Sequence, residues 1–432
     1  MSESKDLFPE FSVLSDEDWR AKVIQDLKGK NFEETLVWKD VLGLEHQPYY
    51  RASSIDRNHL ITSIQKVQKS SPSWVIAHEL RYSGALEKLK EEIQNALENG
   101  VEELTVLGLD AEKGEQLKEL GINNNLCFYL EQLPKANNFS FQIDPIGEYL
   151  RGKNEKLEVE KLVDLFKTTK RNERFLLIDG GVYKSAGANL IQEIACTLQH
   201  ALSYFDALTD ADLSAEEVAQ HIEFKVSFGN SYFLEIAKAR ALRFLIHQLF
   251  KSYKVETAPY LWGSGSSTYL AHKDPYTNLL RTTTQAMAAV IGNCDKVSSL
   301  AFDVLESSSK LGNRMAKNIV LILSKEAYLS EVADMAKGSY YIESLTAELA
   351  EKAWDEFLTM EEKGGVLTLF ESGELQQMFD KSWSAELESY KNGKAMIGVN
   401  QFINEEADKL DIRNENRGEK GLKSYLLAKE ID

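Results

Sequence analysis

The chain has 432 residues, of which 43% are hydrophobic and 27% charged, a composition that is ordinary for globular proteins and allows a large core. Its 50 basic and 68 acidic residues give a formal net charge of −18, which argues against nucleic acid as a partner because phosphate binding needs clustered Lys and Arg. No basic amphipathic stretch predicts attachment to a membrane.

The first 50 residues precede any alternation of strands and helices, and they predict an appended arm. Ser15 and Asp18 have the spacing of a capping box, which predicts the start of a helix. Aromatic side chains are frequent here, and the candidate anchors for a partner subunit are Trp19, Phe32 and Trp38. Two interpretations stay open, since the arm either packs on its own chain or contacts a second subunit.

Short β-rich runs alternate with longer amphipathic runs from residue 74 onward. The strands that we predict from this alternation are Trp74–Leu80, Leu104–Leu109, Phe139–Asp144, Phe175–Gly180, His221–Phe228, Tyr253–Ala258, Lys296–Asp303 and Val332–Tyr341. Helical spacing of apolar residues places three stripes on helix faces: Leu86, Leu89, Ile93 and Leu97; Leu190, Ile194, Leu198 and Leu202; and Leu280, Thr283, Met287 and Ile291.

Eight alternating units favour a closed parallel barrel over an open sheet. The fold class that we predict is α/β, a (β/α)₈ TIM barrel over residues 51–403 with a helical and extended arm before it. Residues 404–432 are rich in charges and predict a charged, helical C-terminal tail.

The three cysteines, Cys127, Cys196 and Cys294, are widely spaced and odd in number. This usage predicts free, buried thiols in a reducing compartment rather than a disulfide framework or a zinc knuckle. The amino-terminal residues have no apolar or Arg-rich targeting pattern, and no apolar run is long enough to cross a bilayer. We therefore expect a cytoplasmic protein without a metal site.

Six segments in a fixed order carry a family resemblance: Phe175–Asn189, Glu223–Ala241, Asp274–Asn278, Arg281–Ala289, Lys337–Glu343 and Lys394–Asn400. Together they resemble the barrel domain of the methylmalonyl-CoA mutase family from about residue 170 to 400. The arm, with Trp19 and Trp38, resembles the family's arm more loosely, and in the family that arm contacts the other subunit. Resemblance in packing motifs implies the fold and leaves the chemistry to the site residues.

The catalytic pattern of the family is interrupted in this chain. Catalytic members carry a Tyr-His pair ahead of an Ala-Gly-Ala signature, and the corresponding positions here are Gly181 and Val182, whose side chains donate no hydrogen bond. The substrate-positioning Arg of the family is also missing from residues 258–270, which removes a bidentate partner for a carboxylate. The glycine- and serine-rich run in that segment indicates a flexible loop.

Cobalamin domains of the family use the pattern Asp-x-His-x-x-Gly, in which the His binds cobalt. None of the seven His residues here has an Asp two positions before it. We therefore expect that this chain binds no cofactor, has no flavodoxin-like cobalamin domain, and leaves adenosylcobalamin to a partner subunit.

The resemblance implies a non-catalytic small subunit that pairs with a large catalytic mutase subunit in a heterodimer and is inactive alone. A homodimer of the isolated chain is an open alternative, as is a complex acting on a related acyl-CoA. Two other functions are a barrel enzyme and a CoA-thioester-binding module with a repurposed site. Their weak candidate residues at the carboxyl ends of the strands are Asp179, Tyr183, Lys184 and Glu256.

Overall fold

The computed structural model describes residues 14–51, 59–109, 113, 116, 126–130, 141–153, 159–168, 174–413 and 418–432, with side chains not described at 126–130. The chain divides into two units, residues 1–51 and 52–432, which are described separately below.

The first unit contains two short helices and a hairpin of two-residue strands. Helix α1 spans Asp16–Asp26, α2 spans Phe32–Leu36, and β1 (Trp38–Lys39) pairs antiparallel with β2 (Glu45–His46). The predicted capping box at Ser15 is confirmed, since its hydroxyl accepts a hydrogen bond from the Asp18 amide at 3.1 Å and the Asp18 carboxylate accepts one from the Ser15 amide.

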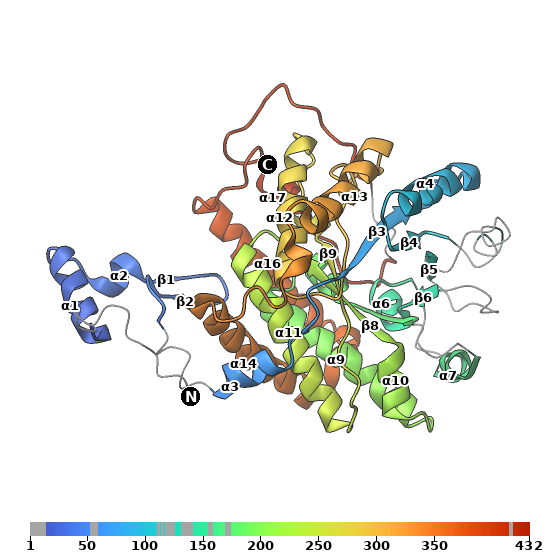
Figure 1. Ribbon diagram of the computed structural model, residues 1–432, viewed down its shortest axis with the longest axis horizontal. Coiled ribbons are helices and arrows are strands. Elements are labelled where there is room, and N and C mark those ends of the chain that lie inside the picture. The colour runs from blue at the N-terminus through green and yellow to red at the C-terminus, as the bar shows by residue number, and fades with distance from the viewer. Residues whose placement is uncertain are drawn as a thin grey trace. The chain divides into compact units, whose positions relative to one another are not determined.

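The second unit is a closed barrel of eight parallel strands, which confirms the predicted fold (Figure 1). The strand order is β10-β3-β4-β5-β6-β7-β8-β9, and the ring closes where Lys296 pairs with Val75 on one side and with Trp262 on the other. The strands span Val75–Arg81 (β3), Glu103–Leu107 (β4), Leu126–Leu130 (β5), Phe141–Ile143 (β6), Leu176–Asp179 (β7), Ile222–Phe228 (β8), Leu261–Gly265 (β9) and Lys296–Val297 (β10).

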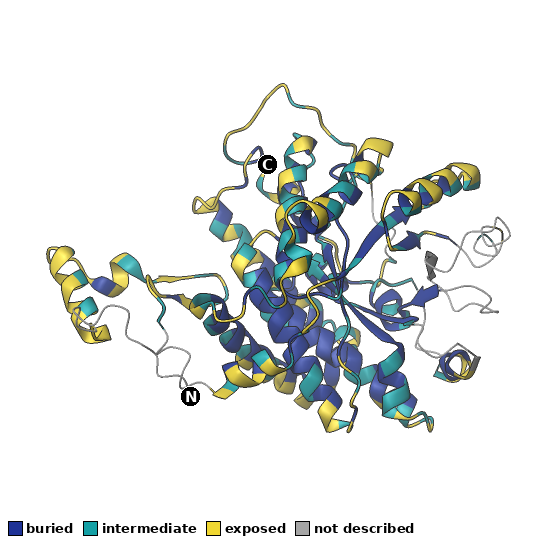
Figure 2. Ribbon diagram, in the orientation of Figure 1, coloured by how far each residue is buried: buried dark blue, intermediate teal, exposed yellow. Residues whose placement is uncertain are grey.

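Helices surround the barrel, and two of them, α9 and α11, bury most of their residues, as Figure 2 shows. Helices α9, α11 and α14 pack against one another. The helices of this unit span His59–Lys66 (α3), Leu86–Glu98 (α4), Pro145–Leu150 (α6), Val159–Thr168 (α7), Gly181–Ser185 (α8), Leu190–Thr209 (α9), Ala215–His221 (α10), Tyr232–Ser252 (α11), Asn278–Ile291 (α12), Lys310–Lys325 (α13), Tyr340–Glu362 (α14), Gly365–Glu371 (α15), Glu374–Lys391 (α16) and Leu427–Ile431 (α17), with 3₁₀ turns Ser267–Tyr269 (η2), Pro275–Thr277 (η3) and Leu329–Glu331 (η4).

Two predicted strands are wrong, and two real strands replace them. Residues 253–258 form a turn after α11 in which Lys254 has a left-handed backbone, and residues 332–341 lead into α14 through Gly338, whose φ is also positive. The real strands are β5 and β9, and β9 lies within the segment interpreted as a flexible loop. Residues 139–140 of another predicted strand lie outside the described part of the chain.

The predicted apolar face of α12 is also wrong. Its buried face consists of small and polar residues, including Asn278, Thr282 and Ala286, whereas Leu280 of the predicted stripe is 72% exposed. The helix packs closely on β9, since a Cβ at Gly263 would lie 2.6 Å from that of Ala289. Small side chains therefore face the barrel because larger ones do not fit there.

Candidate functional site: the mouth and interior of the barrel

The turn after β7 holds the residues that the sequence singled out. Strand β7 ends at Asp179 and helix α8 begins at Gly181, so Gly181 to Lys184 lie at the carboxyl end of the barrel, where sites of this fold are built. Gly181 donates its amide to the Asp179 carboxylate at 2.9 Å, and Val182 is fully buried. Neither residue presents a polar side-chain group to the mouth.

Asp179 is held by contacts within the protein. One carboxylate oxygen lies 2.5 Å from a guanidinium nitrogen of Arg151, which also pairs with Glu148 at 2.8 Å. The Asp179 amide donates to the carboxylate of Asp144, whose other oxygen lies 3.0 Å from the ring of His200. Burial opposes ionisation of Asp144, but this histidine and Arg151 outweigh it and lower the pKa of the carboxyl group.

Tyr183 faces the helices rather than the mouth. It is fully buried, its ring meets His200 and Phe379 edge to face, and burial raises the pKa of its phenol well above the usual value. Its hydroxyl has no hydrogen-bond partner among the described residues. A phenol that is sealed from solvent and stays protonated has no access to a substrate.

Lys184 belongs to a buried cluster of two lysines and two glutamates. Lys238 contacts Glu193 at 2.9 Å and Glu235 at 2.6 Å, and Lys184 lies 3.9 Å from each of the same carboxylates. Burial raises the pKa of Glu193 despite both lysines. The charges balance, so the cluster ties α8, α9 and α11 together without an excess charge for a ligand.

A first ionic group lies inside the barrel, near the mouth. Glu79 on β3 lies 2.6 Å from the ammonium of Lys225 on β8, and its other oxygen accepts hydrogen bonds from Ser264 at 2.7 Å and Ser298 at 2.9 Å. Burial alone would raise the pKa of Glu79, but the charge of Lys225 and these hydrogen bonds lower it to about 2.

An indole ring separates this group from a second one. Trp262 on β9 is fully buried, and the ammonium groups of Lys225 and Lys296 lie 4.1 Å and 4.0 Å from its ring centroid. Lys296 in turn contacts Glu103 at 2.5 Å and Glu223 at 2.6 Å. Side chains from at least four strands thus occupy the axis, where a threaded ligand chain would have to pass.

Residues 404–432 are called the C-terminal strap below. Their described parts, 404–413 and 418–432, lie across the mouth instead of forming a helical tail over their length, and the helix within these parts is confined to α17. The strap is joined by backbone hydrogen bonds to loops that follow β6, β7, β9 and β10. These bonds run from Leu410 to His272, Arg413 to Leu305, Gly418 to Arg151, Leu422 to Leu150 and Tyr425 to Ser185, at 2.7–2.9 Å.

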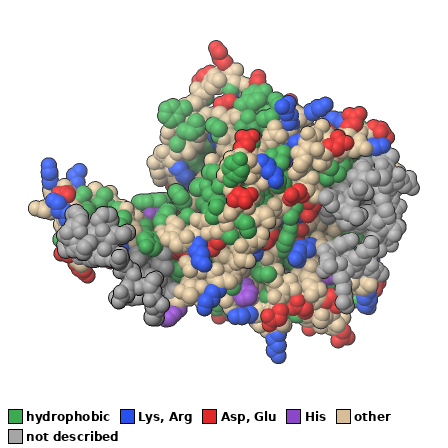
Figure 3. Space-filling view, in the orientation of Figure 1, with side chains coloured by type: hydrophobic (Ala, Val, Ile, Leu, Met, Phe, Trp, Pro, Cys, Tyr) green, Lys and Arg blue, Asp and Glu red, His purple; other side chains and the backbone are tan. Residues whose placement is uncertain are grey.

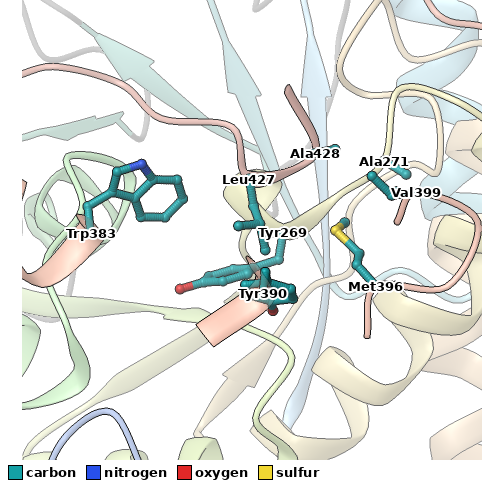
Figure 4. Packing of buried hydrophobic residues seen from close by; sticks show 8 residues of the cluster. All are labelled: Tyr269, Ala271, Trp383, Tyr390, Met396, Val399, Leu427 and Ala428. Carbon is teal, nitrogen blue, oxygen red and sulfur yellow. The ribbon is translucent and has the colours of Figure 1, made fainter. Parts of the chain in front are cut away.

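Close backbone contact and an aromatic cluster fix the strap. A Cβ at Gly418 would overlap the carbonyl oxygen of Gly152, so only glycine allows this approach. Tyr425 stacks on Trp383 at 4.9 Å, and Leu427 is fully buried in a cluster with Tyr269 (Figure 4). The strap therefore contacts the carboxyl end of α8, the helix that carries Gly181 and Val182.

Other predicted residues lie away from the mouth. Glu256 is exposed in the loop before β9, which is the amino-terminal end of the barrel, so its predicted position is wrong. In the first unit, Trp19 contacts the buried ring of Phe32 edge to face at 6.2 Å, whereas Trp38 stacks on His46 and stays 56% exposed. Of the three proposed anchors, Trp38 offers the largest free surface.

The ionic interior was not predicted from the sequence, although the sequence contains a signal for it. Glu223, Lys225 and Ser227 alternate with apolar residues in β8, and this period of two places polar side chains on one face of a strand. No group of three or more His, Cys, Asp or Glu able to hold a metal occurs in the described ranges. Among those residues, no helix is long and apolar enough to cross a membrane.

Comparison with known proteins agrees with this architecture. The methylmalonyl-CoA mutase family model matches residues 139–424. The methylmalonyl-CoA mutase small subunit of Porphyromonas gingivalis is 30% identical over 93% of this chain and 72% of its own length. The small subunit of Streptomyces virginiae is 33% identical over 53% of this chain and 38% of its own, and the large subunit of P. gingivalis is 30% identical over 58% and 36%.

The closed barrel and this match define the class: the chain belongs to the methylmalonyl-CoA mutase family. Within the family, the match to the P. gingivalis small subunit extends over nearly the whole of this chain. The chain spans only about a third of the length of several other relatives, including the large subunit.

Proposed function

We propose that this chain is the non-catalytic small subunit of a heterodimeric methylmalonyl-CoA mutase. Its role is to bind and stabilise a large subunit that interconverts succinyl-CoA and methylmalonyl-CoA with adenosylcobalamin. The observation that carries the proposal is the ionic interior of the barrel, in which Trp262 lies between the ammonium groups of Lys225 and Lys296. A thioester chain cannot enter without displacing charges that are already paired, and such displacement is costly.

The residues of this chain do not fit a cobalamin site. Four of the seven histidines, His46, His78, His200 and His221, are at most 3% exposed, and burial lowers the pKa of His78 to about 4. The remaining three, at positions 59, 247 and 272, lack the Asp that the family's cobalt-binding pattern places two residues earlier. The cofactor therefore belongs to the large subunit in this proposal.

The arm, residues 1–50, is proposed to contact the large subunit through Trp38. A cytoplasmic location is inferred from thiol usage, because Cys196 and Cys294 are free and buried. The side chain of Cys127 is not among those that the structure describes. The isolated chain is free to self-associate through the same surfaces.

The decisive experiment mixes this chain with the large mutase subunit of the same organism. We expect one peak of summed mass in size-exclusion chromatography, and isomerisation of methylmalonyl-CoA only when the large subunit is present. The chain alone should retain no corrinoid and turn over no acyl-CoA. Turnover by the isolated chain would support the barrel enzyme instead, and calorimetric binding of CoA esters without turnover would support the CoA-binding module.

A further inference from the structure

The outer face of α12 and its leading turn is apolar and exposed to solvent. Leu280 is 72% exposed and Tyr276 53% exposed, and the face is nearly free of charge. Between residues 275 and 291 the one charged side chain is Arg281, which donates to Thr277 at 2.9 Å, to Asn278 at 3.0 Å and to the carbonyl of Ile397. In a chain with 27% charged residues, such a stretch departs from an ordinary water-facing helix.

The loop at 395–403 extends this face. It carries no charged residue and is attached to α12 by the Arg281 contact with Ile397. Gly398 lies beside Asp274 and Thr277 in the turn that leads into the helix. The exposed apolar residues Tyr276, Leu280, Ile397, Phe402 and Ile403 are called the α12 patch below; Figure 3 shows hydrophobic side chains gathered over α12 on the face in view.

Phe402 is the most exposed residue of the α12 patch. It is 81% exposed, and its φ of 52° lies in the left-handed region, which is unfavourable for a bulky residue. The ring therefore gains little burial in return for its backbone strain. Its exposed ring is available to a partner.

The size of the α12 patch matches the centre of an interface. A large aromatic side chain presents about 150–250 Å², and Leu and Ile present somewhat less, so the five residues, which are about 50–80% exposed, present roughly 400–600 Å². The largest apolar patch on a typical monomer is about 300–600 Å² and is often functional. A stable interface uses about 800 Å² on each side, with an apolar core and a polar rim.

We propose that the α12 patch is the surface on which the large mutase subunit docks, an inference that rests on the proposed function. The charges beside the patch favour this occupant over a second copy. Glu405, Glu406 and Asp408 are exposed directly after it and outnumber the exposed Lys409, so a twofold contact between two copies with a charge of −18 each would oppose two rims of net negative charge. The fitting partner has an apolar pocket bordered by Lys or Arg.

The test measures binding of the full chain to the large subunit by calorimetry, with the variants Phe402→Asp and Leu280→Asp. Either change should weaken binding at least ~30-fold, because a charge at a central anchor is desolvated without a partner. Asp tolerates a left-handed backbone, so Phe402→Asp should fold normally. The matched control is Tyr328→Asp, an aromatic position that is 65% exposed with a φ of 53° and lies outside the patch.

The outcomes separate this inference from the proposed function. Wild-type chain that fails to bind the large subunit overturns both. Wild-type chain that binds while both patch variants bind equally well overturns the inference alone. If the variants abolish self-association in light scattering but leave binding to the large subunit unchanged, the occupant is a second copy and the inference is again wrong. Unchanged binding of Tyr328→Asp together with loss for the patch variants supports it.

Discussion

The substitution Glu79→Gln tests whether the ionic interior is a structural filling. Glutamine keeps an oxygen for Ser264 and Ser298 and removes only the charge that faces Lys225 at 2.6 Å. The fold lowers the pKa of Glu79 from 4.5 to about 2, and this difference corresponds to about 3 kcal/mol of the free energy of unfolding. We therefore expect the variant to lose about 3 kcal/mol at pH 7.

The pH dependence has a defined sign. Because the folded-state pKa of Glu79 is below its unfolded value, its stabilisation is complete above about pH 4.5 and is lost as the pH falls towards 2. Urea unfolding followed by circular dichroism at several pH values should show the difference between wild type and variant shrinking over that window.

The control is Glu374→Gln on the surface. Glu374 lies 3.6 Å from Lys363, and both side chains are exposed, so this substitution should change the free energy of unfolding by less than about 1 kcal/mol. The structural role of the Glu79–Lys225 pair would be refuted if the loss in unfolding free energy caused by Glu79→Gln stayed constant from pH 7 to 3. A loss no larger than that of the control would refute it as well. Such a result is expected if the Glu79 carboxylate has no partner in the free protein and pairs only with a bound ligand.

Three further substitutions test the packing around the site. Leu427→Ala should lower the free energy of unfolding by about 2–5 kcal/mol because it leaves a cavity under the strap, and limited proteolysis should then cut the strap sooner than in wild type. Gly187→Ala, at a φ of 96° and with a Cβ 3.0 Å from that of Trp383, should lower the thermal midpoint, whereas Gly373→Ala, with a positive φ but open space, should lower it less. Lys238→Met should cost about 3–5 kcal/mol in urea unfolding, since it leaves two buried carboxylates with one distant lysine; an unchanged midpoint would mean that the cluster is hydrated.

The alternation of β-rich and amphipathic runs was enough to predict the barrel. The predicted number of strands was nevertheless right only because two false strands offset two missed ones, β5 and β9. Strand β9 was missed because its residues include Gly263 and Gly265, which composition assigns to loops. These glycines are needed because α12 packs closely against β9 at both positions, and this contact cannot be recognised from the local sequence. Conversely, residues 253–258 are rich in β-forming side chains, yet the chain turns there at Lys254 after α11 ends.

The site was predictable in part, for a different reason. The loss of polar side chains at Gly181 and Val182 is visible in the sequence once the family pattern is known. The filling of the barrel is not, because Glu79, Lys225 and Trp262 come from three strands far apart in the chain. The sequence predicts a tail at residues 404–432 because charged residues dominate the segment. The few residues near Leu427 that are buried and hold the strap in place do not stand out among them.

A barrel filled with paired charges has a different thermal character from one filled with aliphatic side chains. Exposure of apolar surface raises the heat capacity of unfolding, and exposure of polar surface lowers it. The groups around Lys225 and Lys296 should therefore flatten the curve of stability against temperature in this part of the molecule. The hydration that these ions give up on folding also weakens on heating, so their relative contribution grows as the temperature rises.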